Sequence, residues 1–349
     1  MLLVYRYRVK SLNGLLNKQS RAVNYVWNFC NDTQKHALQW RKKWPSGFDL
    51  NVLTTGSSKE LGLHSGTINA VCEQYAKSRE QLKRPYLRYR SNKSLGWVPI
   101  KGRELKREGT AFRFAGNTFR IFHSRALPDG KIKDSTNFSR DARGNWFLNI
   151  VVEIAEAPRR ELIKGLGIDL GLKELAAFST GEVISNLNHY KKLEPSLAIA
   201  QRANKKRLVT KIHAKIANRR SDQLHKISNR ITREFDYIAV GNIKPSGLAK
   251  TKMAKSVLDA SWSTFRNQLA YKAIKHGAWY EEVNESFTSQ VCSNCGALPD
   301  SRPKGIADLG IRQWICCECG ISHDRDVNAA LNILARHGHV SPAEGISLI

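Results

Sequence analysis

Two Cys-x-x-Cys pairs near the end of the chain constrain its folding more than any other feature. Cys292 and Cys295 form the first pair, Cys316 and Cys319 form the second, and twenty residues separate them. Four thiolates in this pattern supply the tetrahedral shell of Zn²⁺, and a glycine follows each pair, where the chain must turn tightly around the metal. The spacing therefore predicts one structural zinc ion.

Three further cysteines need another explanation. Cys317 fits the zinc pattern only if the second pair were spaced by one residue, so we expect it to be a bystander. Cys30 and Cys72 stand among apolar and aromatic residues, which is typical of small core residues. We expect no targeting segment, because a strand pattern begins at once. Cytosolic thiols stay reduced, so disulfides between the two pairs are the weaker interpretation.

The charge of the chain indicates a polyanionic partner. The 349 residues include 57 Lys and Arg against 30 Asp and Glu, which gives a formal net charge of +27. Nucleic acid is the expected partner of such a protein. A basic membrane-surface protein is the alternative, but the sequence has no long apolar span and no basic amphipathic helix with a clean apolar face. We expect a cytoplasmic, nucleoid-associated prokaryotic protein with two or more domains.

The first half of the chain reads as short strands around a helical module. Alternating apolar residues predict a strand at 2–9, and helical spacing predicts helices at about 13–44 and 65–83. Turn residues separate three further predicted strands, at 112–114, 118–122 and 146–152. We expect these strands and the first one to form a β-barrel, followed by a linker at 157–160.

A basic and aromatic run spans residues 83–90. Cations that seek phosphates alternate there with rings that stack on bases or sugars. A solvated basic loop explains the run equally well. The residues of this run that we expect to bind nucleic acid are Arg84, Tyr86, Arg88 and Arg90.

An acid stands between glycines on an apolar strand in the second half. Asp169 lies in the segment 165–171, and residues 174–179 read as a partner strand across a turn. Gly167 and Gly171 have no side chains, so we expect a phosphate backbone to approach a metal held by Asp169. The motif is weak alone, because an Asp between glycines is more often part of a turn.

A strongly basic helical pair is expected at about 201–235. A solvated helix face is the usual explanation of such charge, but opposite charges are nearly absent here, and a polyanion would offset the self-repulsion. We therefore favour nucleic-acid binding. The residues expected to contact nucleic acid are Lys205, Lys206, Arg207, Lys211, Lys215, Arg219, Arg220 and Arg230.

The order of these motifs resembles the transposon-encoded TnpB proteins, compact RNA-guided DNA endonucleases related to type V CRISPR effectors. The resemblance is specific over about residues 163–336 and looser before them. Its features are Asp169 in GIDLG, a strand at 237–240 that ends at Gly241, Trp262 and Phe265, the segment 288–296 around the first Cys pair, and Asp326 in DRDVNAALNIL.

The resemblance implies an α+β multidomain protein. A wedge module with a β-barrel would comprise residues 1–10 and 98–160, and a helical recognition module residues 11–97. A RuvC-like, RNase H-like α/β nuclease domain would comprise residues 161–291 and 320–336, with a zinc-binding knuckle at 292–319 and a flexible tail at 337–349. The implied partners are a guide RNA from the transposon end and target double-stranded DNA with a short adjacent motif. The protein would act as a monomer or a dimer on the RNA.

The chain departs from the family at one catalytic position. Most members have Glu-Asn after this strand, and that Glu is the second catalytic carboxylate, whereas this chain has Gly241 and Asn242. Glu285 follows a predicted strand at about 279–283. It resembles a subset of the family, and eukaryotic relatives, in which the catalytic Glu has moved to this strand. The alternative is that Glu285 is a surface acid and that cleavage is lost.

Asp326 completes the implied catalytic triad at the start of a predicted helix, and Asp324 is its local competitor. By the resemblance, Asp169, Glu285 and Asp326 hold two Mg²⁺ ions for phosphodiester hydrolysis. Two other functions stay open: a nuclease-inactive, RNA-guided repressor, and a plain zinc-ribbon nucleic-acid-binding protein. Convergence of the three acids in the fold distinguishes the last of these from the others.

Overall fold

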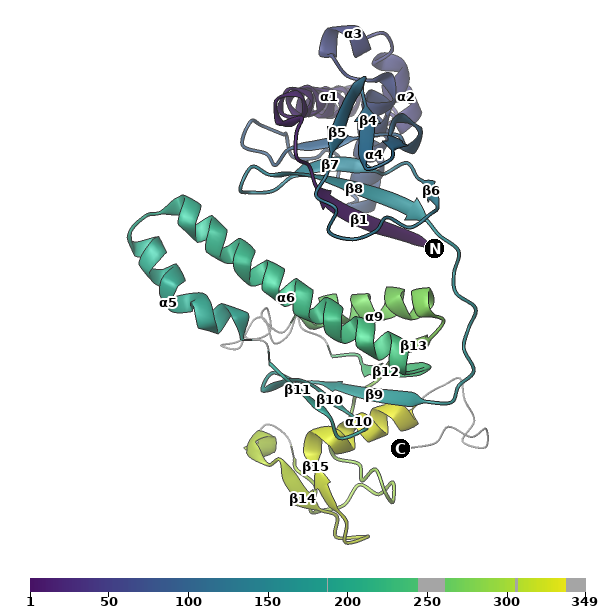
Figure 1. Cartoon of the computed structure of the whole chain (residues 1–349), viewed down its shortest axis with the longest axis vertical. Helices are drawn as coiled ribbons and strands as arrows, with labels where there is room; N and C mark the ends of the chain where they lie inside the picture. Colours follow the sequence, from purple (N-terminus) through teal and green to yellow (C-terminus); the bar gives the residue numbers. More distant parts are fainter. Residues whose placement is uncertain (187, 244–260, 305–306, 337–349) are drawn as a thin grey trace. The chain divides into compact units, whose positions relative to one another are not determined.

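The computed structural model describes residues 1–186, 188–243, 261–304 and 307–336 (Figure 1). The chain divides into two compact units, residues 1–155 and 156–349. The predicted tail at 337–349 lies outside the described residues. In the described part of the chain, no helix has both the length and the apolar character needed to cross a membrane.

Unit 1 contains a five-stranded open sheet. Its main path runs in the order β1 (Leu2–Arg8), β8 (Trp146–Glu153), β7 (Asn137–Arg140) and β2 (Trp97–Pro99), and β6 (Lys131–Ile132) also pairs with β8. Residues of β1 alternate between exposed and buried, as the sequence predicts for a strand with one face on the core. The predicted strand at 2–9 is therefore confirmed.

A separate three-stranded sheet is formed by β3 (Lys106–Glu108), β4 (Ala111–Phe114) and β5 (Asn117–Arg120). The predicted barrel is wrong, because β1 and β2 are the ends of the larger sheet and do not pair with each other. Residue alternation predicts which segments are strands, but it does not encode their partners. Ala115 and Gly116, both with positive φ, turn β5 back onto β4 and keep this hairpin local.

The helices of unit 1 are α1 (Asn13–Gln39), α2 (Gly47–Leu53), α3 (Ser58–Leu61), α4 (Ser65–Gln81) and the short 3-10 helix η1 (Gly102–Glu104). Of these, α1 and α4 contact β2 of the larger sheet, and α2 packs on α4. The helix predicted to reach residue 44 ends at Gln39, where Arg41 takes a positive φ. Cys30 on α1 and Cys72 on α4 are fully buried with 3.7 Å between their Sγ atoms, so the prediction that they are core residues is confirmed.

Unit 2 is built on a five-stranded mixed sheet. The strand order is β11 (Val183–Ser185), β10 (Glu174–Phe178), β9 (Gly165–Leu170), β12 (Tyr237–Gly241) and β13 (Trp279–Val283). β10 is antiparallel to both β11 and β9, whereas β12 runs parallel to both β9 and β13. The carboxyl ends of three adjacent strands therefore meet at one edge of the sheet.

Helices cover both faces of this sheet (Figure 1). On one face, α6 (Lys206–Glu234) and α9 (Trp262–His276) bury Leu224, Trp262 and Phe265 against the strands. On the other, α10 (Arg325–Ala335) packs Ile333 and Leu334 against β12 and β13. Trp262 and Phe265, which carry part of the family resemblance, are thus core residues.

Gly167 is needed for helix packing and not for a phosphate. A Cβ atom at this position would lie 2.0 Å from the carbonyl oxygen of Ala330 on α10. The expectation that Gly167 opens β9 to a nucleic-acid backbone is therefore wrong, because α10 already fills that space. At Gly171, a Cβ would meet the carbonyl oxygen of Glu174 across the turn to β10.

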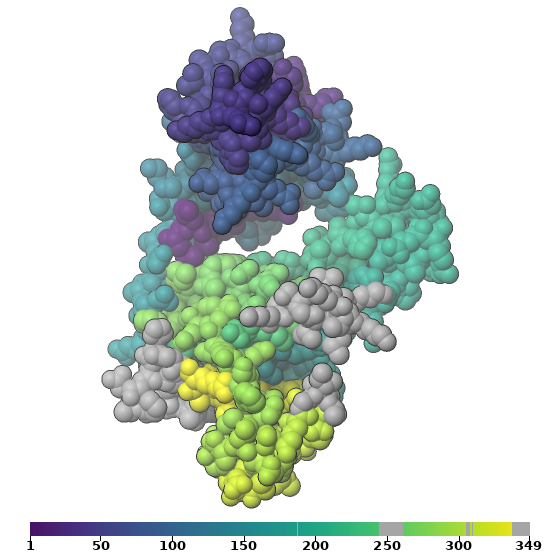
Figure 2. All heavy atoms as spheres, turned by 180° about the vertical axis from the view of Figure 1, so that it is seen from behind, coloured from purple at the N-terminus to yellow at the C-terminus, as the bar shows by residue number. Residues whose placement is uncertain are grey.

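A basic helical hairpin extends from unit 2. It consists of α5 (His189–Arg202) and α6, which pack through Leu197, Ala200, Ile212 and Ile216. The predicted helical pair at 201–235 is wrong in its bounds, because residues 206–234 form the single helix α6 and its partner α5 precedes them, with the turn at residues 203–205. Figure 2 shows the teal hairpin projecting to one side of this unit.

Candidate nuclease site, zinc site and nucleic-acid surfaces

The register of three parallel strands brings Asp169 close to Gly241 and Glu285. Val240 on β12 pairs with Ile168 on β9, so the next residues along the two strands, Gly241 and Asp169, are neighbours. Gly241 in turn pairs with Val283 on β13, two residues before Glu285. Because side chains alternate along strands, these positions share the face that α10 covers.

The three predicted acids border one pocket of about 530 Å³. Asp169, Glu285 and Asp326 come from the end of β9, the segment after β13 and the first turn of α10. The pocket is also lined by Trp262, Thr288, Ser289, Lys173, Arg312 and Arg325. The acids are more than 40 residues apart in sequence at the closest, so only the fold gathers them. A plain zinc-ribbon protein gives no reason for this convergence.

Glu285 fills the place of a side chain at residue 241. A Cβ atom on Gly241 would lie 2.8 Å from Oε2 of Glu285 and 3.4 Å from its Cβ. The carboxylate of Glu285 is therefore next to the position from which the usual second acid of the family would project. A backbone hydrogen bond from Ile243 reaches the same carboxylate.

The acids affect one another electrostatically. Burial, and then the negative charges of Asp326 and Glu285, raise the pKa of Asp169 well above its usual range. Burial also raises the pKa of Glu285, although the nearby Arg266 opposes this shift. A carboxylate surrounded by carboxylates in a partly dry pocket is destabilised unless a cation joins it.

Asp324 and Asp326 have different roles in the fold. Asp324 is the N-cap of α10, where its Oδ1 accepts hydrogen bonds of 3.0 Å from the backbone N–H groups of Asp326 and Val327. Asp326, in contrast, borders the pocket and accepts two bonds from one nitrogen of Arg312, at 2.9 and 2.6 Å. Sequence reasoning did not predict Arg312.

This donor set suits Mg²⁺. Hard cations of this kind bind carboxylate oxygens, and three carboxylates bordering one pocket supply them. Burial and the neighbouring carboxylates raise the pKa of Asp169, so a cation held among the three acids would stabilise its ionised form. Arg312 already supplies positive charge at Asp326, with a guanidinium nitrogen 2.6 Å from Oδ2.

The four predicted zinc ligands do form a cluster. The Sγ atoms of Cys292, Cys295, Cys316 and Cys319 all lie within 4.8 Å of one another. Two of these separations are 3.7 and 3.8 Å, close to the edge of about 3.8 Å that a tetrahedron with Zn–S bonds of about 2.3 Å requires. The exposed Cys317 is not part of the cluster, in agreement with its predicted role as a bystander.

Two short strands, β14 (Gln313–Ile315) and β15 (Ser322–Asp324), and the 3-10 helix η2 (Ala307–Gly310) complete the knuckle. His323 places Nε2 3.0 Å from Sγ of Cys292 and packs its ring on Trp314, with ring centroids 4.8 Å apart. This imidazole lies where it can donate to a thiolate ligand.

Two asparagines of α10 join the knuckle to the pocket that the three acids border. Asn328 and Asn332 each donate hydrogen bonds to the carbonyl oxygens of Thr288 and Val291, and Oδ1 of Asn328 accepts from the backbone N–H of Ser293. The segment between Glu285 and the first zinc ligand is therefore fixed to the helix that carries Asp326. The Asn-Ala pattern of the sequence marks Asn328, but it does not identify the backbone groups that Asn328 binds.

The basic and aromatic run of unit 1 is held firmly on α1. Residues 86–91, which we call the strap, comprise the end of this run and Ser91. Side chains of α1 form hydrogen bonds with the strap backbone, as a neighbouring strand would in a sheet. Asn31 exchanges two hydrogen bonds with Leu87, and Asn28 exchanges two with Arg90. Trp27 and Asn24 donate to the carbonyl oxygens of Arg88 and Ser91. The strap is therefore not a loosely solvated loop.

The four predicted nucleic-acid-binding residues of the basic and aromatic run divide into two groups. Arg84, Tyr86 and Arg88 are exposed, and Nζ of Lys35 lies 5.1 Å from the Tyr86 ring. Arg90 is instead half-buried, with Nε bonded to Oδ1 of Asn24 and a terminal nitrogen to the carbonyl oxygen of Leu95. Its burial lowers its pKa. Asn24, Asn28 and Asn31 were missed, although their spacing places them on one face of a helix.

The predicted basic residues of the helical hairpin lie mostly at its surface. Exposed cations at the turn and along α6 are Lys205, Lys206, Arg207, Lys211, Lys215 and Arg219, and Arg220 is half-buried. Arg230 differs, because its guanidinium binds both carboxylate oxygens of Glu182, at 3.0 and 2.6 Å. This ion pair makes Arg230 a weaker candidate for phosphate binding than the others.

Comparisons with known proteins identify relatives of this chain. Residues 149–252 match the family model described as "Probable transposase", and residues 262–333 match the model of the Cas12f1-like TNB domain. A "Putative RNA-guided DNA endonuclease" of Streptomyces pristinaespiralis is 37% identical over 226 residues, covering 61% of this chain and 55% of that protein. InsQ of Escherichia coli K12, which carries the same description, is 30% identical, covering 58% of this chain and 56% of InsQ.

A more distant relative is the TnpB-like protein L79 of Acanthamoeba polyphaga mimivirus, 30% identical over 48% of this chain and 36% of that protein. The chain thus spans about half the length of the first two relatives and about a third of L79. A solved complex of Cas12f1 with guide RNA and target DNA has a similar protein fold, with a TM-score of 0.61 and 13% identity over 91% of this chain and 82% of Cas12f1. The predicted resemblance is therefore confirmed, and the chain is a relative of the TnpB and Cas12f1-like proteins.

Proposed function

We propose that the chain is an RNA-guided endonuclease that cleaves target DNA by metal-assisted phosphodiester hydrolysis. The observation that carries this proposal is the position of Glu285, whose carboxylate lies 2.8 Å from the place of a Cβ on Gly241. A carboxylate at this position supplies the charge that is missing from residue 241. The names of the relatives support the activity.

Asp169, Glu285 and Asp326 would hold two Mg²⁺ ions, which when bound activate a water molecule and stabilise the leaving 3′ oxygen. The protein positions these acids through rigid elements. Trp262 donates its indole N–H to the carbonyl oxygen of Gly171, 3.2 Å away, and so fixes the chain just after Asp169. Asp324 fixes the start of the helix that carries Asp326.

The cations around the pocket suit a phosphate substrate. Lys173, Arg312 and Arg325 line the same space as the acids. Once Arg312 leaves Asp326, its guanidinium is positioned to bind a phosphate oxygen in the pocket. The exposed hairpin and strap cations would hold the nucleic acid by its backbone, with sequence specificity supplied by pairing to a guide RNA.

The proposal includes a domain assignment. Residues 1–10 and 98–160 would act as the wedge, although as open sheets, and residues 11–97 as the recognition module. The sheet of residues 161–291, with 320–336, would act as a RuvC-like nuclease domain and residues 292–319 as a zinc-stabilised insert. The protein would work as a monomer or a dimer on the RNA, in the cytoplasm.

The test is plasmid cleavage by the purified protein with its guide RNA and Mg²⁺. Wild type should cleave, whereas Asp169→Asn and Glu285→Gln should bind the target and leave it intact. Glu161→Gln is the matched control, because Glu161 is an exposed acid outside the pocket. If wild type binds target and never cleaves it, the chain is an RNA-guided repressor and Gly241 marks a lost nuclease.

A further inference from the structure

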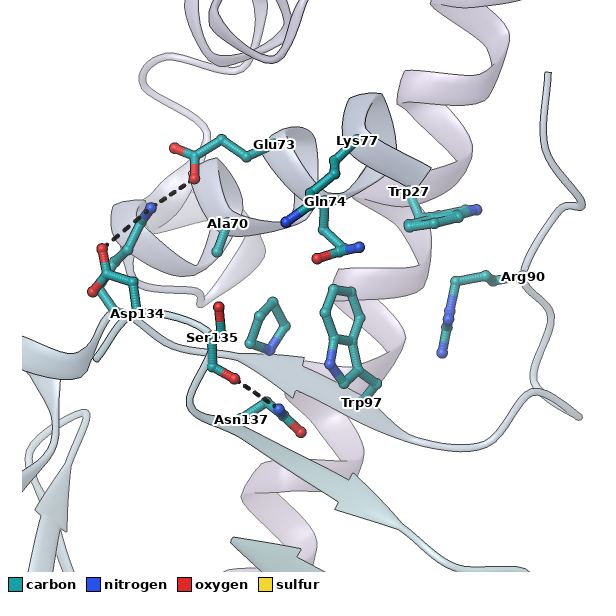
Figure 3. A pocket seen from close by; sticks show the side chains of 12 residues that line it. Trp27, Ala70, Glu73, Gln74, Lys77, Arg90, Trp97, Asp134, Ser135 and Asn137 are labelled. Carbon is teal, nitrogen blue, oxygen red and sulfur yellow. Dashed lines mark hydrogen bonds and ion pairs between the residues drawn. The ribbon is translucent and has the colours of Figure 1, made fainter. Parts of the chain in front are cut away.

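Unit 1 has a pocket of its own, of about 650 Å³, between α1, α4 and β2. Figure 3 shows how its side chains face one another. Gln74 and Lys77 approach from α4, Trp97 lies opposite them on β2, and Trp27 and Arg90 close one end. None of these residues takes part in the nuclease site proposed above.

The aromatic walls of this pocket are held in fixed positions. The rings of Trp27 and Trp97 are nearly perpendicular, with centroids 6.5 Å apart and an interplanar angle of 89°. The Trp27 indole N–H donates to the strap, and its ring packs on the edge of Tyr75. The guanidinium of Arg90 lies 5.7 Å from both indole rings. A flat ligand would therefore meet aromatic surfaces that need no rearrangement.

Charge in the pocket is unevenly distributed. At one end, Lys101 pairs with Glu73 at 2.7 Å and approaches Asp134 at 3.8 Å, so these two acids are largely compensated. Lys77 is exposed near the centre, and among the residues that the structure describes no acid forms an ion pair with it. An anionic ligand with a flat ring satisfies both Lys77 and the indoles.

We propose that this pocket binds one unpaired nucleobase of a single-stranded nucleic acid, which stacks on Trp97 while an adjacent phosphate pairs with Lys77. Every base has a π-face and every nucleotide a phosphate, so this chemistry serves RNA and DNA alike. The side-chain carbonyl of Gln74 faces the same space and would accept a hydrogen bond from a base edge. The inference rests on the proposed function only in naming guide RNA or target DNA as the source of this nucleic acid.

Binding of fluorescein-labelled single strands tests the site without cleavage. The full chain is titrated with oligothymidine and oligouridine of about 12 nucleotides, a length suited to a single-strand groove. Trp97→Leu should raise the dissociation constant by roughly 5- to 150-fold, the range that loss of one base–aromatic stack gives. Trp97→Phe, which keeps a ring, should recover most of the affinity.

Lys77→Gln should lower the slope of log affinity against log salt by about 0.7, as expected for the loss of one single-strand phosphate contact. Controls are Trp40→Leu and Lys43→Gln, which alter an exposed ring and an exposed cation of the same unit outside the pocket. Lys77 is on the surface, so Lys77→Gln should fold normally. It therefore tests the site even if Trp97→Leu unfolds the protein. Thermal unfolding of each variant identifies that case.

Two results would overturn the inference. If an oligonucleotide with abasic positions binds wild type as tightly as the normal strand, the pocket recognises charge and not a base. If duplex DNA loses as much affinity as single strands in Trp97→Leu, the site does not require an unpaired base. If Trp97→Leu weakens binding of oligouridine more than of oligothymidine, the bound nucleic acid is the guide RNA. If it weakens binding of oligothymidine more, the bound nucleic acid is the opened target DNA. All of these readouts persist in the Asp169→Asn variant, so a failure of cleavage does not affect them.

Discussion

Glu285 and Gly241 share one space: Oε2 of Glu285 lies 2.8 Å from the position that a Cβ on Gly241 would take. The parallel pairing of β12 with β13 produces this relationship, because Gly241 is opposite Val283 and Glu285 follows two residues later. An acid on either strand end therefore reaches the same part of the pocket.

Asp169 should destabilise the protein in the absence of Mg²⁺. Its pKa is raised in the fold, so above about pH 4 the unfolded chain releases a proton that the folded chain retains. The unfolding free energy contributed by this group thus falls as pH rises from about 4 toward the folded-state pKa. Asp169→Asn removes this loss and should raise the Tm without added Mg²⁺, by about 2 °C or more, with a larger difference at pH 8 than at pH 5.

Calorimetry with and without Mg²⁺ measures this effect. Mg²⁺ should raise the Tm of wild type, since a ligand that binds only the folded state stabilises it, and should have little effect on the variant. A Tm of Asp169→Asn below that of wild type at pH 8 without Mg²⁺ contradicts the electrostatic account of the pocket.

The cysteine cluster should bind one zinc ion. Native mass spectrometry should show one zinc per chain in wild type and in Cys317→Ser, and none in Cys292→Ser. Cys292 is one of the four clustered cysteines, whereas Cys317 is not. Zinc removal should increase hydrogen exchange in the knuckle and, through Asn328 and Asn332, in the first turns of α10. Zinc loss from Cys317→Ser would show that the ligand set is wrong.

Arg88 and Arg90 should give opposite results although they are two residues apart. Arg88→Gln should leave the Tm unchanged and lower the salt slope of nucleic-acid binding by about 0.7–0.9, since an exposed cation contacts a phosphate. Arg90→Gln should lower the Tm, because it removes hydrogen bonds to Asn24 and Leu95. Equal Tm values for the two variants would show that the hydrogen bonds of Arg90 do not stabilise the strap.

Asn31 tests the same strap from the side of α1. Asn31→Ala should lower the unfolding free energy by about 1–3 kcal/mol, because it leaves buried polar groups of Leu87 and Tyr75 without their partner. Urea unfolding measures this change. Asn92→Ala is the control, because Asn92 is exposed and follows the strap, whereas Asn13 begins α1.

His276 should make the protein sensitive to acid. Burial, with the charges of Arg233 and Lys275, lowers the pKa of His276 from 6.5 to about 4. Between these values the unfolded chain binds a proton that the folded chain does not, so stability is complete above about pH 6.5 and falls as pH decreases toward 4. His276→Asn should flatten the Tm profile in this window. An unchanged profile would mean that another group controls acid unfolding.

Sequence reasoning predicted individual elements better than their assembly. Periodicity indicated β1, α1, α4 and β12, since each buries one face or runs through a core. It could not show that β1 and β2 are opposite ends of an open sheet, because partners are set by long-range packing. Likewise, the family resemblance singles out Asp169 and Asp326 through their local motifs, whereas the proximity of Glu285 to Gly241 depends on strand register.

The missed residues act through contacts that are distant in sequence. Arg312 binds Asp326 across fourteen residues, and Asn31 binds Leu87 across 56. Each looks like an ordinary surface residue in the sequence. Gly167 shows the opposite error, because a glycine beside a catalytic acid suggested access for substrate, whereas it accommodates the backbone of Ala330.

The most direct test of the account moves the carboxylate back. Cleavage of target plasmid is compared for wild type, Glu285→Ala, and the double variant Gly241→Glu with Glu285→Ala, in which removal of the Glu285 carboxylate makes room at residue 241. The account predicts that wild type cleaves, that Glu285→Ala does not, and that the double variant recovers part of the activity. Full cleavage by Glu285→Ala alone would show that Glu285 is not the second acid and would contradict the account.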